Sequence, residues 1–530
     1  MEAEGRMSLV RIARKNLWRE WLAVSLRSAS DFGFRIVVVL VALGGVVHAG
    51  EDGVALELTY SKAIQMALAK NFDIQIEKFN PVIARAETVS EEGRFDPRVE
   101  VEYSYEESRR DLTSLDPTLD SGSPERSGLA RFARESGTEG RAGVAGVTPL
   151  GTRYDFGASV DRDTDTRSAI DQRYNTFVGG TITQPLLRGF GPDVNLAQIR
   201  IARADQAISA WALRDRIIDV VTDTALIYND LFFQIQNLAV QIRSRDLAER
   251  TLRDNERRAE IGVMSPLDVV QAQADVAARE ERVLVAERAV ADNQNFLKQL
   301  VTDEIADVLR TPVRIAPPPL DRDVAVDLET DLERAFEIRP DYRQALLDLQ
   351  KRNINVVFNR NQALPRLDLV GSLGLNGIET EVGESVSQLT VPSNLAGSLG
   401  AIFSLPIPNR EARGQLQVSK LEVARALVGL KQAEQSIFVE ADNAAGQIDT
   451  TRQRIQTTRA ARVFAERTLE AAQARLASGT ATTFEVLQFQ RDLAEAEVAE
   501  MRALTDHQKA IAEYARTVGT TLEANYISLE

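Results

Sequence analysis

The sequence predicts an α+β membrane protein made of two related halves, which combines strands suited to a membrane β-barrel with long coiled-coil α-helical hairpins. Three observations lead to this fold class. A long segment recurs once within the chain, several short segments alternate between apolar and polar residues, and two helical patterns run without proline for more than fifteen turns. The recurrence indicates duplication, the alternation indicates strands with one apolar face, and the long patterns indicate helices too long for one globular core.

The internal repeat is clearest between residues 249–275 and 466–492. Both stretches carry the letters ERTL and a glycine, Gly262 or Gly479, at the same offset of 217 residues. A second offset of 268 residues relates positions nearer the start of each half: Pro97 with Pro365 and Arg98 with Arg366. Chance matching between helices rich in Ala, Glu and Arg is the alternative. It does not account for helix-breaking residues that also match.

Composition excludes several classes of function. The 530 residues carry a net charge of −15, so the chain lacks the basic surface of a nucleic-acid-binding protein. It has no cysteine, which excludes disulfides, thiolate metal sites and a cysteine nucleophile. His48 and His507 are the two histidines, and we expect His507 to be solvated on a helix. No nucleophile–base set is present, so we expect no enzyme, no metal site and no cofactor.

The N-terminus has the features of a secretory signal peptide, which we place at residues 1–49. Basic residues precede an apolar run from Ile36 to Val47, and Val47-His48-Ala49 is compatible with cleavage. An uncleaved anchor is the alternative. No later run of about 20 apolar residues could form a membrane-spanning helix. A membrane-spanning part of the mature chain must therefore be a β-barrel.

Strands are expected at about 97–185 in the first half and at about 365–406 in the second. Apolar residues occupy every second position from Val99 and again from Leu367. This period of two fits a barrel with lipid outside and water inside, although a half-buried sheet in a soluble protein alternates in the same way. An extra hairpin is expected near 144–161, flanked by Gly-, Ser- and charge-rich loops at 117–143 and 161–171.

Helices are expected over most of the remaining chain. A pattern from 196 to 261 would span roughly 100 Å at 1.5 Å per residue, and Pro266 suits the start of the next helix. The expected long helices are 196–261, 266–301, 415–477 and 484–518, with short opening helices at 61–69 and 331–336. The expected organisation is a first repeat at 50–310, a Pro-rich linker at 311–321, a second repeat at 322–520 and a tail at 521–530.

These elements resemble the TolC-like outer membrane efflux protein family over nearly all of the mature chain. The resemblance rests on Ala67-Leu68 and Asn71 in the opening helix, on Pro97 and Pro365 before strands, on Gln184-Pro185-Leu186, and on the helix–turn–helix tip from Gly262 to Ala272. The tip occurs twice. The resemblance implies a homotrimer in the outer membrane, with about four strands per protomer in a shared twelve-stranded barrel and a periplasmic tunnel of helices. The extra hairpin departs from this pattern.

The two tips are the candidate docking site. The resemblance implies that a periplasmic adaptor docks there and connects the channel to an inner-membrane pump or ABC transporter. Small and apolar side chains at exposed turns are suited to helical hairpins of such a partner. The residues concerned are Gly262, Val263, Met264, Ser265, Pro266 and Leu267 at the first tip, and Gly479, Thr480, Ala481, Thr482, Thr483 and Phe484 at the second. The two glycines would also serve as C-caps of their helices.

The resemblance further implies a periplasmic gate beside the tips. Asp268 and Glu485 match acids of this gate, whereas Gln488 replaces a second acid. The arginine and tyrosine of studied relatives fall at Ala481 and Leu476, so this sequence lacks the matching cross-links of their closing network. The alternative for each acid is a favourable interaction with the N-terminus of its own helix.

We therefore expect an exit duct for substrates exported across the outer membrane, as in efflux or type I secretion. The alternative is a periplasmic structural coiled-coil protein without a pore. No feature of the sequence distinguishes drugs, metal ions or proteins as the exported substrate.

Overall fold

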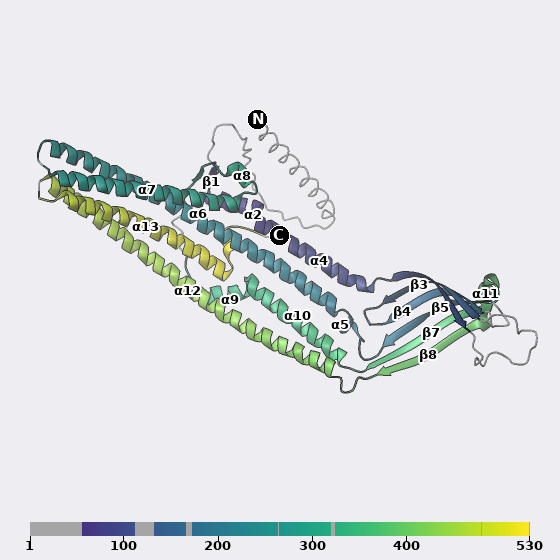
Figure 1. Ribbon diagram of the computed structural model, residues 1–530. Coiled ribbons are helices and arrows are strands. Elements are labelled where there is room, and N and C mark those ends of the chain that lie inside the picture. Colours follow the sequence, from purple (N-terminus) through teal and green to yellow (C-terminus); the bar gives the residue numbers. More distant parts are fainter. Residues whose placement is uncertain are drawn as a thin grey trace, which may run out of the picture.

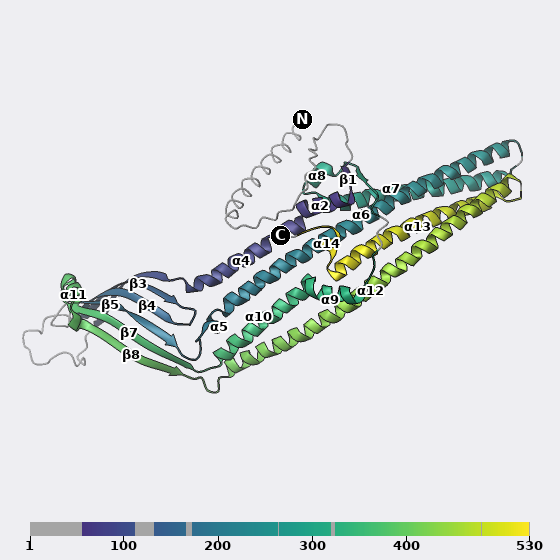
Figure 2. The same ribbon diagram turned by 180° about the vertical axis from the view of Figure 1, so that it is seen from behind.

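The computed structural model describes residues 56–111, 132–165, 172–262, 264–319, 324–478 and 480–528. The predicted signal peptide lies outside them. The molecule is elongated, with a β-sheet at one end and two long helical hairpins that extend away from it (Figure 1). The same arrangement is seen from behind (Figure 2).

Six antiparallel strands form the sheet, in the order β2-β3-β4-β5-β7-β8. Their bounds are β2 Arg98–Asp111, β3 Phe132–Val147, β4 Arg153–Asp165, β5 Gln172–Pro185, β7 Arg366–Glu379 and β8 Leu395–Ser404. The extra hairpin is β3–β4 and joins the sheet between β2 and β5. Within the described residues, β2 and β8 are the edge strands, and each pairs on one side only.

Two predicted loops are partly strand. Residues 132–143 belong to β3 and residues 161–165 to β4, so the loop predictions at 117–143 and 161–171 were wrong there. Their glycines and charges favour loops locally, but backbone hydrogen bonds to β2 and β5 hold these residues in the sheet. Gly143 shows why glycine fits: a Cβ atom there would meet the Phe156 backbone oxygen at 2.9 Å.

Across the middle of the sheet, the register separates an apolar face from a polar face. Residues directly opposite each other in antiparallel strands share a face. One row crosses all six strands with apolar side chains: Val101, Ala142, Ala158, Val178, Leu375 and Leu395. A row on the other face reads Glu102, Arg141, Ser159, Phe177 and Asn376. The apolar face is open to its surroundings, since Val101 is 79% exposed and Leu373 is 60% exposed.

Two long hairpins carry the helical part. The first pairs α6 (Ala197–Glu260) with α7 (Pro266–Val301), and the second pairs α12 (Arg410–Ala477) with α13 (Thr483–Val518). These bounds lie close to the predicted ones because proline, glycine and capping residues mark the ends. The internal repeat remains a prediction from the sequence. No helix among the described residues is both long enough and apolar enough to cross a membrane.

Shorter elements pack beside the hairpins. α4 leads into β2, and α10 packs against α6 and α12 and leads into β7 (Figure 1). The remaining elements are α2 Tyr60–Lys70, α3 Phe72–Glu77, α4 Phe79–Glu92, η1 Gly93–Phe95, α5 Pro192–Asn195, α8 Ile305–Val308, α9 Leu328–Ile338, α10 Pro340–Gln362, α11 Val382–Gln388, η2 Pro392–Asn394 and α14 Thr521–Ala524.

A buried tyrosine anchors the middle of the molecule. Strand β1 (Leu56–Leu58) pairs in parallel with β6 (Val313–Ile315), which lies inside the predicted linker. The hydroxyl of Tyr228 donates to the Leu58 backbone oxygen at 3.1 Å and to the Ala316 backbone oxygen at 2.6 Å. Burial raises the pKa of Tyr228 to about 12, against the opposing effect of the Ala316 bond. The tyrosine thus connects β1 and the linker between the two halves to α6.

His507 is buried, so the prediction of a solvated histidine was wrong. It is 5% exposed, and its Nδ1 lies 3.0 Å from the Thr451 hydroxyl oxygen of α12. The helical pattern could not reveal this contact because it depends on how α12 packs against α13.

Candidate functional site at the tips of the helical hairpins

The first tip is the turn between α6 and α7. Gly262 has φ +78°, a left-handed conformation that glycine adopts readily where a helix ends. Pro266 begins α7, and the Ser265 hydroxyl accepts a hydrogen bond from the Leu267 N–H at 3.2 Å. Leu267 is 63% exposed. The tip is therefore a capped turn that presents an apolar side chain to its surroundings.

The second tip, between α12 and α13, is held by side-chain bonds. The Thr482 hydroxyl caps α13 by accepting from the Glu485 N–H at 3.2 Å. Arg475 donates to the Thr480 backbone oxygen at 3.1 Å, and its guanidinium lies 3.7 Å from the Glu485 carboxylate. Phe484 is 58% exposed. Both tips thus combine a fixed backbone with an outward apolar side chain.

Most of the predicted docking residues are accessible. The exposed ones are Gly262, Ser265, Pro266, Leu267, Thr480, Thr482 and Phe484. Met264 and Ala481 are half-buried, and Thr483 is buried. Val263 and Gly479 lie outside the described residues.

Among the described residues, no hydrogen bond or ion pair joins the three predicted gate residues to one another. Glu485 pairs with Arg475 of its own hairpin. The side chain of Gln488 donates to the Asp492 carboxylate at 2.9 Å. Across the described part of the chain, no side-chain hydrogen bond or ion pair engages Asp268. A gate made of these three residues would therefore require several copies of the chain.

A buried ionic network behind the tips was not predicted. Arg279 of α7 is 2% exposed and pairs with Asp275 at 2.7 Å. Its guanidinium also donates to the backbone and hydroxyl oxygens of Ser244 on α6, both at 2.9 Å. From the other hairpin, Arg491 of α13 donates to the Asp275 carboxylate at 3.0 Å, and Gln490 accepts from Arg279 at 3.4 Å. The network joins the two hairpins.

The sequence held one signal for this network. The buried apolar residues of α7 include Ala272, Val276, Val283 and Ala286, and Arg279 falls on the same seam at coiled-coil spacing. A charged residue at a seam position requires a buried partner. At the repeat offset Arg279 corresponds to Ala496, so only the first half supplies this arginine.

Burial sets the energetics of the network. Desolvation lowers the pKa of Arg279, and the neighbouring Asp275 opposes that shift; a guanidinium nevertheless stays charged in a protein. Because both ions are taken out of water, removal of one leaves the other uncompensated, which typically costs about 3–5 kcal/mol. The network therefore holds the relative position of the two hairpins.

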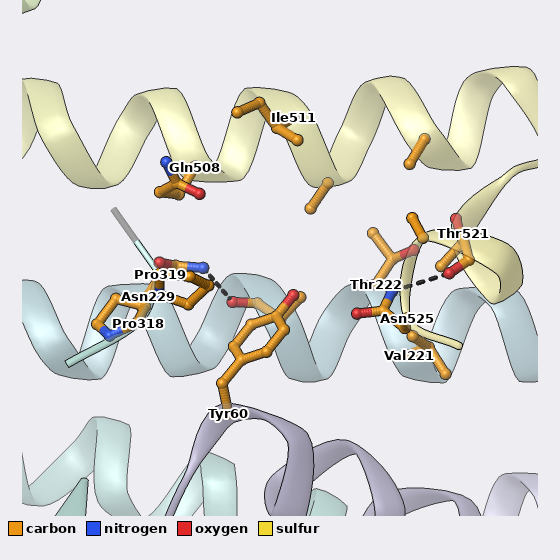
Figure 3. Close-up of a pocket in the computed structure, with 14 residues that line it drawn as sticks. Tyr60, Val221, Thr222, Asn229, Pro318, Pro319, Gln508, Ile511, Thr521 and Asn525 are labelled. Atoms are coloured by element: carbon orange, nitrogen blue, oxygen red, sulfur yellow. Dashed lines mark hydrogen bonds between the residues drawn. The ribbon is translucent and has the colours of Figure 1, made fainter. Parts of the chain in front are cut away.

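A small cavity lies farther from the tips, between α6, α13 and α14. It measures about 30 Å³ and is also lined by Tyr60 and Pro318 (Figure 3). The hydroxyls of Thr222 and Thr521 and the amide oxygen of Asn229 have no hydrogen-bond partner among the described residues. Such a space holds one or two waters and is far below the roughly 300–1,000 Å³ of a small-molecule site.

The sequence matches the family described as outer membrane efflux protein over residues 152–302 and 332–520. These ranges include both tips and the buried network. A sequence comparison with curated proteins gave no match.

Solved structures of outer membrane channels share the fold. The CmeC outer membrane channel of Campylobacter jejuni has a TM-score of 0.63 at 17% identity, with 87% of this chain and 86% of that chain covered. The open state of the MtrE outer membrane channel of Neisseria gonorrhoeae has a TM-score of 0.60 at 17% identity, with 93% and 98% covered. VceC, an outer membrane protein of Vibrio cholerae, has a TM-score of 0.62 at 16% identity, with 87% and 96% covered.

We predict that Asp275→Asn lowers the free energy of unfolding by about 3–5 kcal/mol, because Arg279 and Arg491 lose their shared carboxylate. Asp292→Asn is the matched control. Asp292 also forms an i,i+4 pair on α7, with Arg288, but both side chains are exposed, so its loss should cost less than about 1 kcal/mol. Denaturant unfolding followed by circular dichroism in detergent measures both. Equal effects of the two substitutions would contradict a special role for the buried pair.

Proposed function

Because this chain belongs to the outer membrane efflux protein family, we propose that it forms a trimeric duct through which an inner-membrane transporter exports its substrate. The chain resides in the outer membrane, with a large helical portion in the periplasm. In the proposal, the sheet crosses the membrane, the hairpins form the wall of a periplasmic tunnel, and a periplasmic adaptor docks at the tips.

The observation that carries the proposal is the exposed apolar face of the sheet. An apolar face of six strands, with Val101 79% and Leu399 78% exposed, suits lipid and would be a liability in water. The opposite face carries charged pairs such as Arg141–Asp155 at 2.8 Å, as the wall of a wet channel would. A periplasmic structural protein without a pore does not account for this segregation.

The edges of the sheet support closure by further copies. Within the described residues, β2 and β8 leave one side unpaired, and unpaired backbone groups cost several kcal/mol each in hydrocarbon. The helices that continue from these strands, α4 and α12, lie on opposite sides of the molecule (Figures 1 and 2). Both carry exposed apolar side chains: Phe79, Val82 and Ile83 on α4, and Val418, Leu421 and Val428 on α12. A ring of copies would cover both edges.

Three copies of a six-stranded sheet would form an eighteen-stranded barrel, and we propose this in place of the twelve strands expected from the resemblance. The difference comes from β3 and β4, which occupy the middle of the sheet. A barrel widens with its number of strands.

The absence of native cysteine allows a direct test of the ring. Glu102→Cys on β2 is combined in turn with one cysteine at each polar-face position of β8. We predict that at least one combination gives disulfide-linked dimers and trimers, because β2 of one copy would lie beside β8 of the next. The β8 positions are Ala396, Ser398, Gly400, Ile402 and Ser404. Ser159→Cys on the interior strand β4 replaces Glu102→Cys in the control and should give no ladder. Denaturing gels without reductant report the result. Ladders beyond three copies, or none in the whole series, would contradict the trimer.

We propose the tips as the adaptor-docking surface. Leu267 and Phe484 project from turns whose backbones are fixed by caps, which suits them to enter grooves of a helical partner. The C-cap role of Gly262, supported by its φ of +78°, is compatible with docking. The identity of the exported substrate would then depend on the pump.

The combined substitution Leu267→Ser and Phe484→Ser should abolish export while trimers form normally, because docking loses its apolar contacts. Leu284→Ser is the control, since Leu284 lies on α7 away from the tip and is 65% exposed. Export by the cognate pump and trimer content in outer-membrane fractions are measured together. If export survives the double substitution, the tips are not the docking surface.

We also propose that Asp268 and Glu485 line the periplasmic mouth of the trimer, with Gln488 one turn further along α13. Two acids from each copy would favour cations in a narrow opening. The nearby Arg475 would reduce the effective charge of Glu485.

Asp268→Asn with Glu485→Gln should reduce cation selectivity of the pore in planar bilayers, because the mouth loses its carboxylates. Asp254→Asn with Glu470→Gln, exposed acids more than one turn from the tips, is the control. If the two acids only stabilise the starts of their helices, the double substitution would lower stability and leave reversal potentials unchanged.

A further inference from the structure

The short helix α11 connects β7 to β8 at the end of the sheet far from the hairpins (Figures 1 and 2). We infer that α11 is an interfacial helix that contacts lipid at the outer boundary of the membrane through Val382 and Val386. The inference rests on the proposed lipid-facing position of the apolar face of the sheet.

α11 packs on the apolar face of the sheet. Ser385 of α11 is fully buried, and its hydroxyl lies 2.8 Å from the Thr176 hydroxyl. Thr176 is paired with Gly377 and lies two residues from Val178, so all three share the apolar face. A Cβ atom at Gly377 would collide with the Ser385 backbone oxygen. Glycine is therefore required for the helix to lie against the sheet at this point.

The contacts of α11 with the sheet are polar. The Ser385 hydroxyl also bonds the Gly377 backbone oxygen at 3.0 Å. The side chain of Gln388 accepts from the Ile378 N–H at 3.0 Å and donates to the Glu379 carboxylate at 2.6 Å. A short helix of a water-soluble protein normally turns its apolar side chains toward the protein and its polar side chains outward. Here the polar side chains are directed to the protein.

The apolar side chains of α11 face its surroundings. Val382 and Val386 lie one turn apart on one flank, and both are 45% exposed. Glu384 is two residues from Val386, which places it on the opposite flank of a helix with 3.6 residues per turn. A valine flank opposite a glutamate flank is the pattern of a helix that lies in a membrane interface, with the acids toward water.

The position of α11 along the strands fits that boundary. The apolar alternation of β7 runs from Leu367 to Leu375, close to the roughly 9–11 residues of a tilted strand that crosses a membrane. Gly377, against which α11 packs, is the next residue on that face. Beyond it come Glu379 and Tyr174, paired with each other, and a tyrosine suits the headgroup level.

The geometry favours lipid over another copy of the chain as the neighbour of the α11 valines. α11 lies over β5 and β7, which are interior strands of the sheet, whereas a neighbouring copy would meet the edge strands β2 and β8.

Site-directed spin labelling tests this inference, because the chain has no native cysteine. Single labels at Val386→Cys, Glu384→Cys and Leu373→Cys are compared in trimers reconstituted into vesicles of phosphatidylethanolamine and phosphatidylglycerol. Collision with apolar oxygen reports lipid, and collision with a water-soluble nickel complex reports water. We expect the label at residue 386 to favour oxygen, as the label at residue 373 does, and the label at residue 384 to favour nickel.

Three outcomes would overturn the inference, and they differ in what they say about the sheet. If label 386 favours nickel while label 373 favours oxygen, α11 stands in water and the inference fails, although the sheet still faces lipid. If neither reagent reaches label 386, protein covers the helix and the inference also fails. If label 373 itself favours nickel, the proposed lipid-facing position of the sheet fails, and the inference fails with it.

Discussion

The cost of an unpaired backbone group in hydrocarbon is the constraint on which most of this structure depends. A sheet with an apolar face can enter a membrane only if every N–H and C=O group within the apolar layer has a partner. The five strand pairings give partners to the backbone groups inside the sheet. The outer sides of β2 and β8 remain unpaired and would be covered by other copies in the proposed ring. The unpaired edges therefore support the proposal that the functional unit is larger than one chain. The exposed apolar residues of α4 and α12 extend the same two edges into the helical part.

Sequence patterns predicted the helices well because their ends are fixed by local chemistry. Pro266 and Ser265 start α7, Thr482 caps α13, and Gly262 ends the preceding turn in a conformation that other residues avoid. These effects act within one turn of the chain, so they can be recognised in the sequence alone. The bounds of the strands were harder to predict from the sequence. Residues 132–143 carry glycine and charge, and pairing with the neighbouring strands β2 and β4 keeps them extended.

In the candidate site, too, locally determined features could be predicted from the sequence, and features that depend on packing could not. Both tips could be located from their glycines, caps and repeated spacing, and the structure describes exposed Leu267 and Phe484 where those signals lie. The network of Asp275, Arg279 and Arg491 was missed because it joins α7 to α13, and no local pattern specifies which helices meet. A buried arginine at a seam position was its one visible sign. His507 and Thr451 make the same point, since their contact depends on the packing of α12 against α13.

The hairpin β3–β4 changes the shape of the proposed conduit. Three copies supply the same number of long helical hairpins whether or not the hairpin is present, so the periplasmic tunnel would keep its calibre. The barrel would have half as many strands again and would be roughly one and a half times as wide. The conduit would then flare toward the cell exterior like a funnel. Resistance to flow would be concentrated at its narrow end, and a molecule that had passed the tips would meet no second barrier of comparable size on its way out.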